Sequence, residues 1–398
     1  MPGMSLRPTL YGKMVGVVLL ACMLVGGALA LFSFTARAQE GGAGGAVNAA
    51  AAQVVRTYPG AAPCHTTLQA CISGAADGDV IQILPGTYIT NSINITRSVS
   101  LIGLGATPEG VILQPVGGRM FTINPPGMTA SNVISNMTIE NAVTSSGSGG
   151  AIRINDGSGA PHFQNLILRN NQVTFAGGGG GGALRVIPSV PVTLVNVLIY
   201  NNRATGAGGG VSVSGDLTII DSQILSNAAD SFGGGVQVGG ALVMRNTQVL
   251  SNSAAQAGGG VQVGGVATLT GVVLGANRSA TLGGGAHFSA TATLSATTVI
   301  SNSAEGGGGV LFIAQGSVID SYFERNAALS GGGVASLATV LITDTDYISN
   351  SAFYAGGGAY FLAAAAVHGG KFSENRAQNP LLSGSGGGLF STGAIVME

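Results

Sequence analysis

Near the C-terminal end of the chain, polar side chains recur at a spacing that could bring them together. Tyr322, Asp346 and Lys371 follow one another at a near-constant interval, and Glu324 closely follows the first of them. An aromatic ring, two carboxylates and an ammonium group can contact a sugar or a cation, and glycoside hydrolysis needs one carboxyl group as acid and a second as base or nucleophile. We predict a weak glycan or Ca²⁺ contact at these four residues and assign no residue a catalytic role. The alternative is that they only keep the surface soluble.

Other chemistry has little support in the sequence. The four histidines are isolated from one another and form no metal-ligand set: His65, His162, His287 and His368. The glycine clusters are not phosphate-binding loops, because no Gly-Lys-Ser/Thr follows them. Only 8% of the residues are charged and the formal net charge is −1, so the chain lacks the basic surface that nucleic-acid binding requires. We predict no metal, no nucleic-acid partner and no cofactor, with Ca²⁺ as the alternative.

The elements that must position these residues belong to a repeat. Nine asparagines follow one another along the chain: Asn171, Asn202, Asn227, Asn252, Asn277, Asn302, Asn326, Asn350 and Asn375. The first step is longer than the others, which are nearly equal, and a glycine cluster usually follows each asparagine six to eight residues later. A near-constant step of about 25 residues falls in the range that indicates a stacked repeat.

Each repeat contains short apolar runs separated by turn residues, as residues 217–238 show. No run is long enough for a helix, so three strands per turn predict a parallel β-helix of about 12 rungs of 24–25 residues. The positions three and eight residues before each asparagine are apolar or aromatic throughout, which predicts two columns inside the core. The position six residues before it is mostly Asn, Asp or Gly and predicts a corner. The asparagines themselves predict a second corner with hydrogen-bonded side-chain amides.

The N-terminal segment predicts export. Arg7 and Lys13 precede an apolar run over residues 14–34, and an Ala-Arg-Ala sequence ends at Ala38. This order predicts a signal peptide at residues 1–38, with a retained membrane anchor as the alternative. Residues 39–59 are rich in Gly and Ala and predict a linker, and residues 60–398 form the β-helix.

A cap is expected at residues 64–76. Leu68, Cys71, Ile72 and Ala75 have the spacing of a short amphipathic helix, which would cover the open end of the first rung. Cys64 and Cys71 remain after removal of the leader, and an even pair in an exported chain suggests a disulfide. The alternative is that Cys71 is a small buried thiol.

Several motifs resemble those of known proteins. Gly149-Gly150-Ala151-Ile152, Phe323-Glu324-Arg325-Asn326 and Phe372-Ser373-Glu374-Asn375 resemble the Gly-Gly-Ala-Ile and Phe-x-x-Asn repeats of chlamydial polymorphic outer membrane proteins. The segment from Cys64 to Tyr88 resembles the opening of exported bacterial β-helix proteins of the pectin-lyase-like superfamily. The resemblance covers about residues 60–398 and implies a right-handed helix and a surface role, adhesion in the chlamydial case.

These observations lead to one main functional prediction and two alternatives. We expect a non-enzymatic β-helix protein, secreted or on the surface of a bacterium, that is adhesin-like or contacts an extracellular glycan or surface partner. It would touch a membrane only through a retained N-terminal segment. The first alternative is a polysaccharide lyase or glycoside hydrolase of the pectate lyase or polygalacturonase kind, which the superfamily also contains. The second is a fragment of a larger surface protein.

Overall fold

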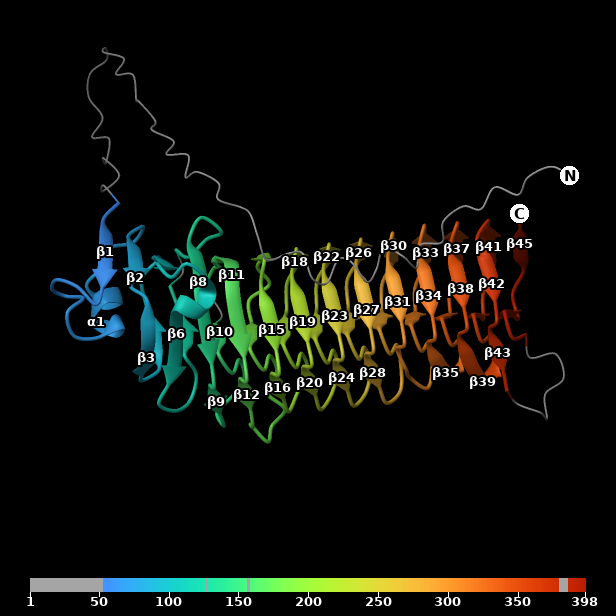
Figure 1. Ribbon diagram of the computed structural model, residues 1–398, viewed down its shortest axis with the longest axis horizontal. Helices are drawn as coiled ribbons and strands as arrows, with labels where there is room; N and C mark the ends of the chain where they lie inside the picture. The colour runs from blue at the N-terminus through green and yellow to red at the C-terminus, as the bar shows by residue number, and fades with distance from the viewer. Residues whose placement is uncertain (1–52, 126, 156–157, 379–385) are drawn as a thin grey trace, which may run out of the picture. The chain divides into compact units, whose positions relative to one another are not determined.

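The chain winds into a parallel β-solenoid of about 13 turns (Figure 1). The structure is a computed structural model that describes residues 53–125, 127–155, 158–378 and 386–398, and these belong to one compact unit. The predicted signal peptide and most of the predicted linker lie outside the described residues. The end of that linker differs from the prediction, because Val55–Tyr58 forms strand β1 and pairs with β2. None of the helices in the described ranges is long and apolar enough to span a membrane.

A regular rung contains two four- or three-residue strands, a very short third strand and a last three-residue strand. In one rung these are β18 (Leu217–Ile220), β19 (Gln223–Leu225), β20 (Ala228–Ala229) and β21 (Val236–Val238). Each strand pairs in parallel with its counterpart one rung later, as Leu217 does with Leu242. The strands of neighbouring rungs therefore stack about 4.8 Å apart. The three predicted strands are present as β18, β19 and β21, and β20 is a fourth, shorter strand that the prediction did not include.

The first two strands of the rungs form one 24-stranded sheet. Its members in chain order are β1, β2 (Val80–Ile83), β3 (Gly86–Thr90), β5 (Ser100–Gly103), β6 (Val111–Pro115), β8 (Val133–Glu140), β11 (His162–Arg169), β14 (Val192–Val195), β15 (Leu198–Tyr200), β18, β19, β22 (Leu242–Arg245), β23 (Gln248–Leu250), β26 (Ala267–Thr270), β27 (Val273–Gly275), β30 (Ala292–Ser295), β31 (Thr298–Ile300), β33 (Gly316–Ile319), β34 (Tyr322–Glu324), β37 (Val340–Thr343), β38 (Asp346–Ile348), β41 (Ala365–His368), β42 (Lys371–Ser373) and β45 (Ile395–Met397).

The last strands of the rungs form a separate twelve-stranded sheet. Its members are β4 (Ile93–Ile95), β7 (Phe121–Ile123), β10 (Ile152–Ile154), β13 (Leu184–Val186), β17 (Val211–Val213), β21, β25 (Val261–Val263), β29 (Ala286–Phe288), β32 (Val310–Phe312), β36 (Val334–Ser336), β40 (Ala359–Phe361) and β44 (Leu389–Ser391). The short third strands form two smaller sheets of β9 (Val143–Thr144), β12 (Gln172–Val173), β16 (Arg203–Ala204), β20, β24 (Ser253–Ala254) and β28 (Arg278–Ser279), and of β35 (Ala327–Ser330), β39 (Ser351–Ala355) and β43 (Arg376–Ala377).

The two predicted apolar columns form the core. All members of the column eight residues before the asparagines are buried: Phe163, Leu194, Ile219, Met244, Leu269, Leu294, Val318, Ile342 and Val367. The column three residues before them is also buried, apart from a partly buried Phe372 at its end. The ring of Tyr347 stacks between Phe323 and Phe372 with centroid distances of 4.8 and 4.7 Å. Its hydroxyl group is buried and has no hydrogen-bond partner among the described residues.

Both predicted corners are confirmed by the backbone angles. Every residue in the column six before the asparagines is left-handed, with φ between 45° and 68°: Asn165, Asn196, Asp221, Asn246, Gly271, Ala296, Asp320, Asp344 and Gly369. Asn, Asp and Gly tolerate this region best, which explains their frequency there. At the second corner the left-handed residue is the one just before each asparagine, as Ser226 and Ser251 illustrate. The asparagine side chain is then free to turn inward.

The asparagine ladder is structural, as predicted. The members from Asn171 to Asn350 are 0–1% exposed. From Asn202 onward, each side-chain oxygen accepts hydrogen bonds from both the backbone and the side-chain N–H of the preceding asparagine, as Asn252 does from Asn227 at 2.9 and 3.0 Å. Each amide also donates to a strand carbonyl of the preceding rung. Because these groups are already bonded and buried, the ladder is not a ligand site.

The glycine clusters let the backbones approach one another. Gly233 has φ of 61°, a conformation that suits glycine. A Cβ atom on Gly234 would lie 2.2 Å from the carbonyl oxygen of Gly259 and 2.4 Å from that of Ser253. Gly233 is therefore required for its backbone angle, and Gly234 is required because there is no space for a side chain.

The N-terminal cap is formed by α1 (Leu68–Ser73), a short helix whose Leu68, Cys71 and Ile72 are buried in the core. Thr67 caps the helix by accepting from the Ala70 N–H at 3.0 Å, and the predicted disulfide between Cys64 and Cys71 is present. A second short helix, η2 (Pro108–Gly110), lies between β5 and β6.

An aspartate ties the cap to the first strand. The carboxylate of Asp79 accepts hydrogen bonds from the N–H groups of Val54 and Ala76 at 3.0 and 2.9 Å, and from Arg56 Nε at 3.2 Å. Burial opposes its ionisation, but these donors outweigh that effect, so the pKa of Asp79 lies below its usual value.

Candidate functional site

The predicted polar patch is assembled as the repeat requires. In the strand register Tyr322 pairs with Asp346, and Asp346 pairs with Lys371, on β34, β38 and β42. The side chains of Tyr322, Glu324 and Asp346 are half-buried and Lys371 is exposed. Arg325 Nη2 lies 3.3 Å from Glu324 Oε1. Burial and the neighbouring Glu324 raise the pKa of Tyr322, so its phenol stays neutral near pH 7.

This patch offers a surface contact whose ligand stays a prediction. Asp320 and Asp344, which lie nearby, occupy left-handed corner positions, so turn geometry accounts for them. Within the described part of the chain, no three or more His, Cys, Asp or Glu side chains are grouped so that they could hold a metal ion.

A second candidate lies on the outer face of the twelve-stranded sheet. In each three-residue strand of this sheet the first and third side chains point into the core, as Val236 and Val238 do, and the middle one points outward. The outward residues of successive rungs are in register and form what we call the outer column: Asn94, Thr122, Arg153, Arg185, Ser212, Gln237, Gln262, His287, Leu311, Ala335, Tyr360 and Phe390. Sequence reasoning missed this column.

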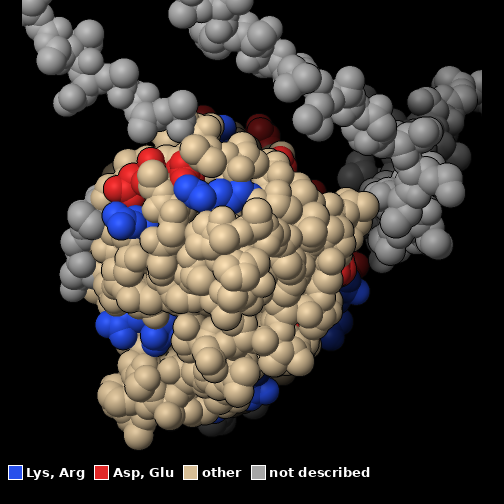
Figure 2. All heavy atoms as spheres, turned by 90° about the vertical axis from the view of Figure 1, so that its left-hand side faces the viewer, with Lys and Arg blue, Asp and Glu red and all other residues tan. Residues whose placement is uncertain are grey.

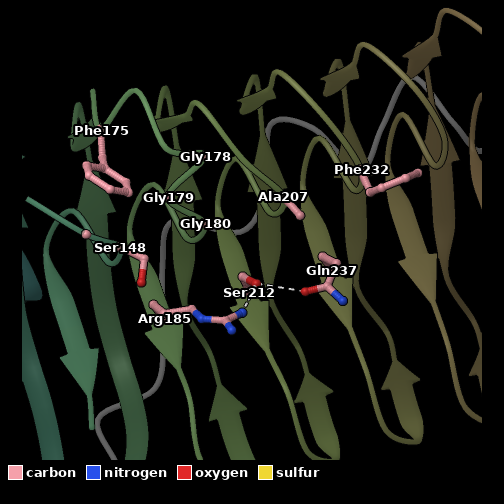
Figure 3. Close-up of a pocket in the computed structure, with 11 residues that line it drawn as sticks. Ser148, Phe175, Gly178, Gly179, Gly180, Arg185, Ala207, Ser212, Phe232 and Gln237 are labelled. Atoms are coloured by element: carbon pink, nitrogen blue, oxygen red, sulfur yellow. Dashed lines mark hydrogen bonds between the residues drawn. The ribbon is translucent and has the colours of Figure 1, made fainter. Parts of the chain in front are cut away.

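A cavity of about 370 Å³ lies over one part of the outer column (Figure 3). Its floor is made by Arg185, Ser212 and Gln237 on β13, β17 and β21, and loop residues make its sides. The described residues that line it are Gly147, Ser148, Phe175, Gly178, Gly179, Gly180, Arg185, Ala207, Ser212, Phe232 and Gln237. Since these residues come from several successive rungs, the repeat itself builds the cavity.

Hydrogen bonds fix the floor of the cavity. Arg185 Nη1 donates to Ser212 Oγ, and Arg185 Nη2 donates to Ser214 Oγ at 3.2 Å. Ser212 Oγ in turn donates to Gln237 Oε1 at 2.7 Å. Figure 3 shows Arg185, Ser212 and Gln237 in one row across neighbouring strands. The side-chain amide of Gln237 ends the row and can donate to a ligand.

Two aromatic rings flank the opening. Phe175 follows β12 and is 39% exposed, and Phe232 follows β20 and is 41% exposed. The wall between them is made of three glycines and an alanine, which leave space: Gly178, Gly179, Gly180 and Ala207 (Figure 3). An exposed phenyl ring offers an apolar face to a ligand, and the row of the floor offers polar groups. This combination of apolar walls and a few fixed polar groups is typical of a binding site.

Arginines gather next to this cavity. Arg153 neighbours Arg185 in the strand register. Arg119 lies close by and donates to the carbonyl oxygens of Gly149 and Ser148, both at 2.7 Å. Burial and the charge of Arg153 lower the pKa of Arg119 to about 10. In the end view of Figure 2, the lower left margin of the molecule carries basic side chains with no acidic ones beside them among the residues described.

The outer column becomes apolar farther along the chain. His287 is 9% exposed, burial lowers its pKa, and its Nδ1 atom has no hydrogen-bond partner in the described part of the chain. A second cavity of about 330 Å³ follows, and it is lined by Leu282, Gly306, Leu311, Ile313, Ser330, Ala335, Ser336, Leu337, Tyr360 and Leu362. Tyr360 stacks on Phe390 with their ring centroids 5.4 Å apart. The outer column thus changes from basic to polar to apolar along the chain.

The described residues that line the first cavity are polar, aromatic or small, and Arg185 is the charged one among them. No carboxylate is among the described residues that line it. Glycoside hydrolysis requires two carboxyl groups at a defined separation.

Comparison with known proteins supports the fold. No protein-family model matches the sequence, and no curated protein matches it. The solved A-module of the Azotobacter vinelandii mannuronan C-5 epimerase AlgE4 is 14% identical, with a TM-score of 0.53 over 83% of this chain and 94% of that chain. The solved Agl-KA catalytic domain is 15% identical, with a TM-score of 0.53 over 83% of this chain and 64% of that chain.

Both solved structures are right-handed β-helices of the pectin-lyase-like fold. The predicted right-handed parallel β-helix is therefore confirmed. At these identities the likeness concerns the fold alone, and fold does not determine function. The resemblance to chlamydial repeats stays a prediction.

Proposed function

We propose that this protein contacts a glycan in the cavity over the twelve-stranded sheet and binds it without turnover. The observation that carries the proposal is the cavity between Phe175 and Phe232, with Arg185, Ser212 and Gln237 on its floor. Sugar rings have apolar C–H faces that pack on aromatic side chains, and their hydroxyl groups exchange hydrogen bonds with amide, hydroxyl and guanidinium groups. The cavity supplies both kinds of contact.

The position of the cavity on the outer column suits a long ligand. Its floor residues come from consecutive rungs about 4.8 Å apart, so a chain molecule lying along the solenoid axis would meet a new outer-column residue at each step. One structural neighbour is, by its name, an epimerase of mannuronan, a polysaccharide. That name, together with the shared fold, makes a polysaccharide a reasonable class of ligand for this chain.

The site of action that we propose is outside the cytoplasm. The order of charged residues, apolar run and Ala-Arg-Ala sequence at residues 1–38 favours export. The Cys64–Cys71 disulfide fits an oxidising compartment. An adhesin-like role at a bacterial surface, in which the cavity contacts glycans of another surface, follows from these two features.

A glycan array probed with the full chain tests the proposal. We expect binding to at least one class of polysaccharide and no release of reducing ends or unsaturated products. Replacing both Phe175 and Phe232 with Ala should weaken binding by at least about 10-fold, since each ring–ligand contact is worth about 1 kcal/mol. The control is Phe353→Ala, because Phe353 is similarly exposed at 46% but lies on β39. Equal effects of the two changes would refute this location.

A second candidate function is enzymatic and uses the polar patch. Tyr322, Asp346 and Lys371 do lie on adjacent strands, and a lyase or hydrolase could use them together with Glu324. Polysaccharide cleavage that disappears in Asp346→Ala and persists in the Phe175 and Phe232 double variant would establish this alternative. Absence of cleavage by the parent chain, with binding intact, would leave the non-enzymatic function.

A further inference from the structure

We propose that Arg203 and Thr205 are positioning residues of the glycan site, each holding one of the two loops that carry its aromatic rings. The inference rests on the proposed function and adds two residues that are not among the described residues lining the cavity. Both belong to residues 203–208, which we call the central segment. Three observations carry the inference: the place of this segment in the stack, its contact with the Phe175 loop and its contact with the Phe232 loop.

The central segment lies between the two aromatic loops in the stack. It begins with β16, and β16 pairs with β12 on one side and with β20 on the other. Phe175 follows β12 and Phe232 follows β20, so their loops are two rungs apart, or about 10 Å along the axis. Figure 3 shows the two rings on either side of Ala207, which belongs to the central segment. A ligand can touch both rings only while both loops keep their places.

Thr205 holds the first loop with its hydroxyl group. Its Oγ1 atom donates to the carbonyl oxygen of Phe175 at 2.7 Å. The same carbonyl accepts from the backbone N–H of Gly178 at 3.1 Å, which closes a tight turn within the loop. The ring lies on Gly177, where a Cβ atom would be 2.4 Å from its Cε1 atom. Loss of the Thr205 hydroxyl group would therefore release the Phe175 carbonyl from the neighbouring rung and leave the turn itself intact.

Arg203 holds the second loop by its charge. Its Nη2 atom donates to both carboxylate oxygens of Asp230, at 2.7 and 3.0 Å. Asp230 lies two residues before Phe232. The two side chains of this ion pair are 50% and 43% exposed, and exposed pairs contribute little to the stability of a fold. We therefore expect the main effect of this pair to be local, on the loop that carries Phe232.

Loops that are held beforehand favour ligand binding for a physical reason. Ordering a loop or a side chain on binding costs free energy, and a loop that is already ordered avoids this cost. Neither Arg203 nor Thr205 is among the described lining residues, so they hold the rings without filling the space between them. The same segment supplies the small Ala207 to the wall. The central segment thus keeps the cavity open and its two sides in place.

The first measurement follows the rings without any ligand. The full chain is labelled with para-fluorophenylalanine, and Phe175→Leu and Phe232→Leu assign the two fluorine NMR signals. In Thr205→Val, which keeps the side-chain shape and loses the hydroxyl group, we expect the Phe175 signal to move toward that of the free amino acid and the Phe232 signal to stay. Thr205→Ser keeps the hydroxyl group and should leave both signals in place. An unchanged Phe175 signal in a folded Thr205→Val protein would overturn the role of Thr205.

The role of Arg203 is tested with the same signals in a double-mutant cycle. Arg203→Gln and Asp230→Asn should each move the Phe232 signal and leave the Phe175 signal unchanged. The double variant should show the same change as either single variant, because both substitutions act through one ion pair. Additive changes, or an unchanged Phe232 signal, would overturn the role of Arg203.

The second measurement links the position of the rings to binding. Titration calorimetry of the full chain uses xylan, glucomannan, dextran and polygalacturonate. For each polysaccharide that binds the parent chain, we expect Thr205→Val to weaken binding about 5-fold and Arg203→Gln about 2–5-fold, as the loss of one hydrogen bond or one exposed ion pair predicts. Thr281→Val is the matched control, because the Thr281 hydroxyl group also donates to a loop carbonyl, that of Gln256, outside this cavity.

The two measurements separate this inference from the proposed function. Unchanged affinity in variants whose ring signals have moved would overturn the link between ring position and binding, as would an equal loss of affinity in Thr281→Val. Failure of all four polysaccharides to bind the parent chain would instead count against the proposed function, and the ring signals would still decide whether Arg203 and Thr205 hold the loops.

Discussion

The asparagine ladder gives the strongest quantitative prediction, and Asn252 in its middle is the residue to change. Its side-chain oxygen accepts from the backbone N–H and the side-chain amide of Asn227 at 2.9 and 3.0 Å. Its own amide donates to the carbonyl oxygens of Ile224 and Leu250 at 2.9 and 3.1 Å, and to Asn277 Oδ1 at 3.0 Å. The side chain thus makes five hydrogen-bond contacts, three of which share its two N–H groups, while it is only 1% exposed.

Asn252→Ala removes all five contacts and leaves at least one buried donor without an acceptor. The backbone N–H of Asn227 donates to the Asn252 side chain and would be left without this acceptor, at a cost of about 1–3 kcal/mol. The other lost bonds each contribute about 1 kcal/mol, and some of their partners keep a second bond. We therefore expect the free energy of unfolding to fall by about 3–5 kcal/mol, which is large for a single substitution.

The matched control is another asparagine of the same rung. Asn246 is exposed, its φ is 47°, and other rungs place Gly271 and Gly369 at the same corner position. Asn246→Gly should therefore change stability by less than about 1 kcal/mol. Chemical unfolding of both variants is the primary assay, and hydrogen exchange around Asn227 shows whether the damage is local, since repeat arrays need not unfold in one step. A loss below about 1 kcal/mol for Asn252→Ala, or an equal loss for Asn246→Gly, would refute the reasoning.

Three further predictions follow from buried or crowded groups. Tyr347→Phe should stabilise the protein by about 1 kcal/mol in chemical unfolding, because it removes a buried hydroxyl that has no partner in the described ranges, and a loss of stability would contradict this. Gly234→Ala should cost about 3 kcal/mol or more because its Cβ would meet backbone carbonyl oxygens, whereas Gly117→Ala has open space and should be neutral. The ionised Asp79 should contribute stability above about pH 4, its unfolded pKa, and lose it as pH falls through its lower folded pKa. The hydrogen-exchange protection factors of the cap amides should therefore fall below about pH 4 in the parent chain. This fall should be absent in Asp79→Asn.

The sequence predicts the inside of this molecule well because the inside repeats. A position that must be apolar in every rung, such as those of Ile224 and Val249, shows the same residue class in each successive repeat. The left-handed corner positions show Asn, Asp or Gly for the same reason. Packing and backbone angles impose the same requirement on every rung. A comparison of residues one repeat apart therefore identifies the core and corner positions.

The candidate site could not be found in that way. Outer-column residues point away from the core, so stacking does not require the same residue class in every rung, and the column changes from Arg153 through Gln237 to Leu311. The tips of the loops also vary, since Phe175 and Phe232 flank a rung that carries Ala207 in the wall between them. The second residue after each glycine cluster is the outer-column residue. Comparing the chemistry of these residues from rung to rung, instead of looking for what repeats, would have revealed the site.

The same reasoning explains why a solenoid with few charges can still select its ligand. In a parallel stack, neighbouring outward side chains are held about 4.8 Å apart by the backbone, whatever their chemistry. A change of an outward residue in one rung therefore changes one position of the outer column without disturbing the core beneath it. Arg153 and Arg185 are adjacent steps of this kind, and the polar Ser212 and Gln237 continue the row. Ligand preference along this face is thus set by the order of the outer residues, and stability is set by the inner ones, so substitutions in the two columns should have separable effects.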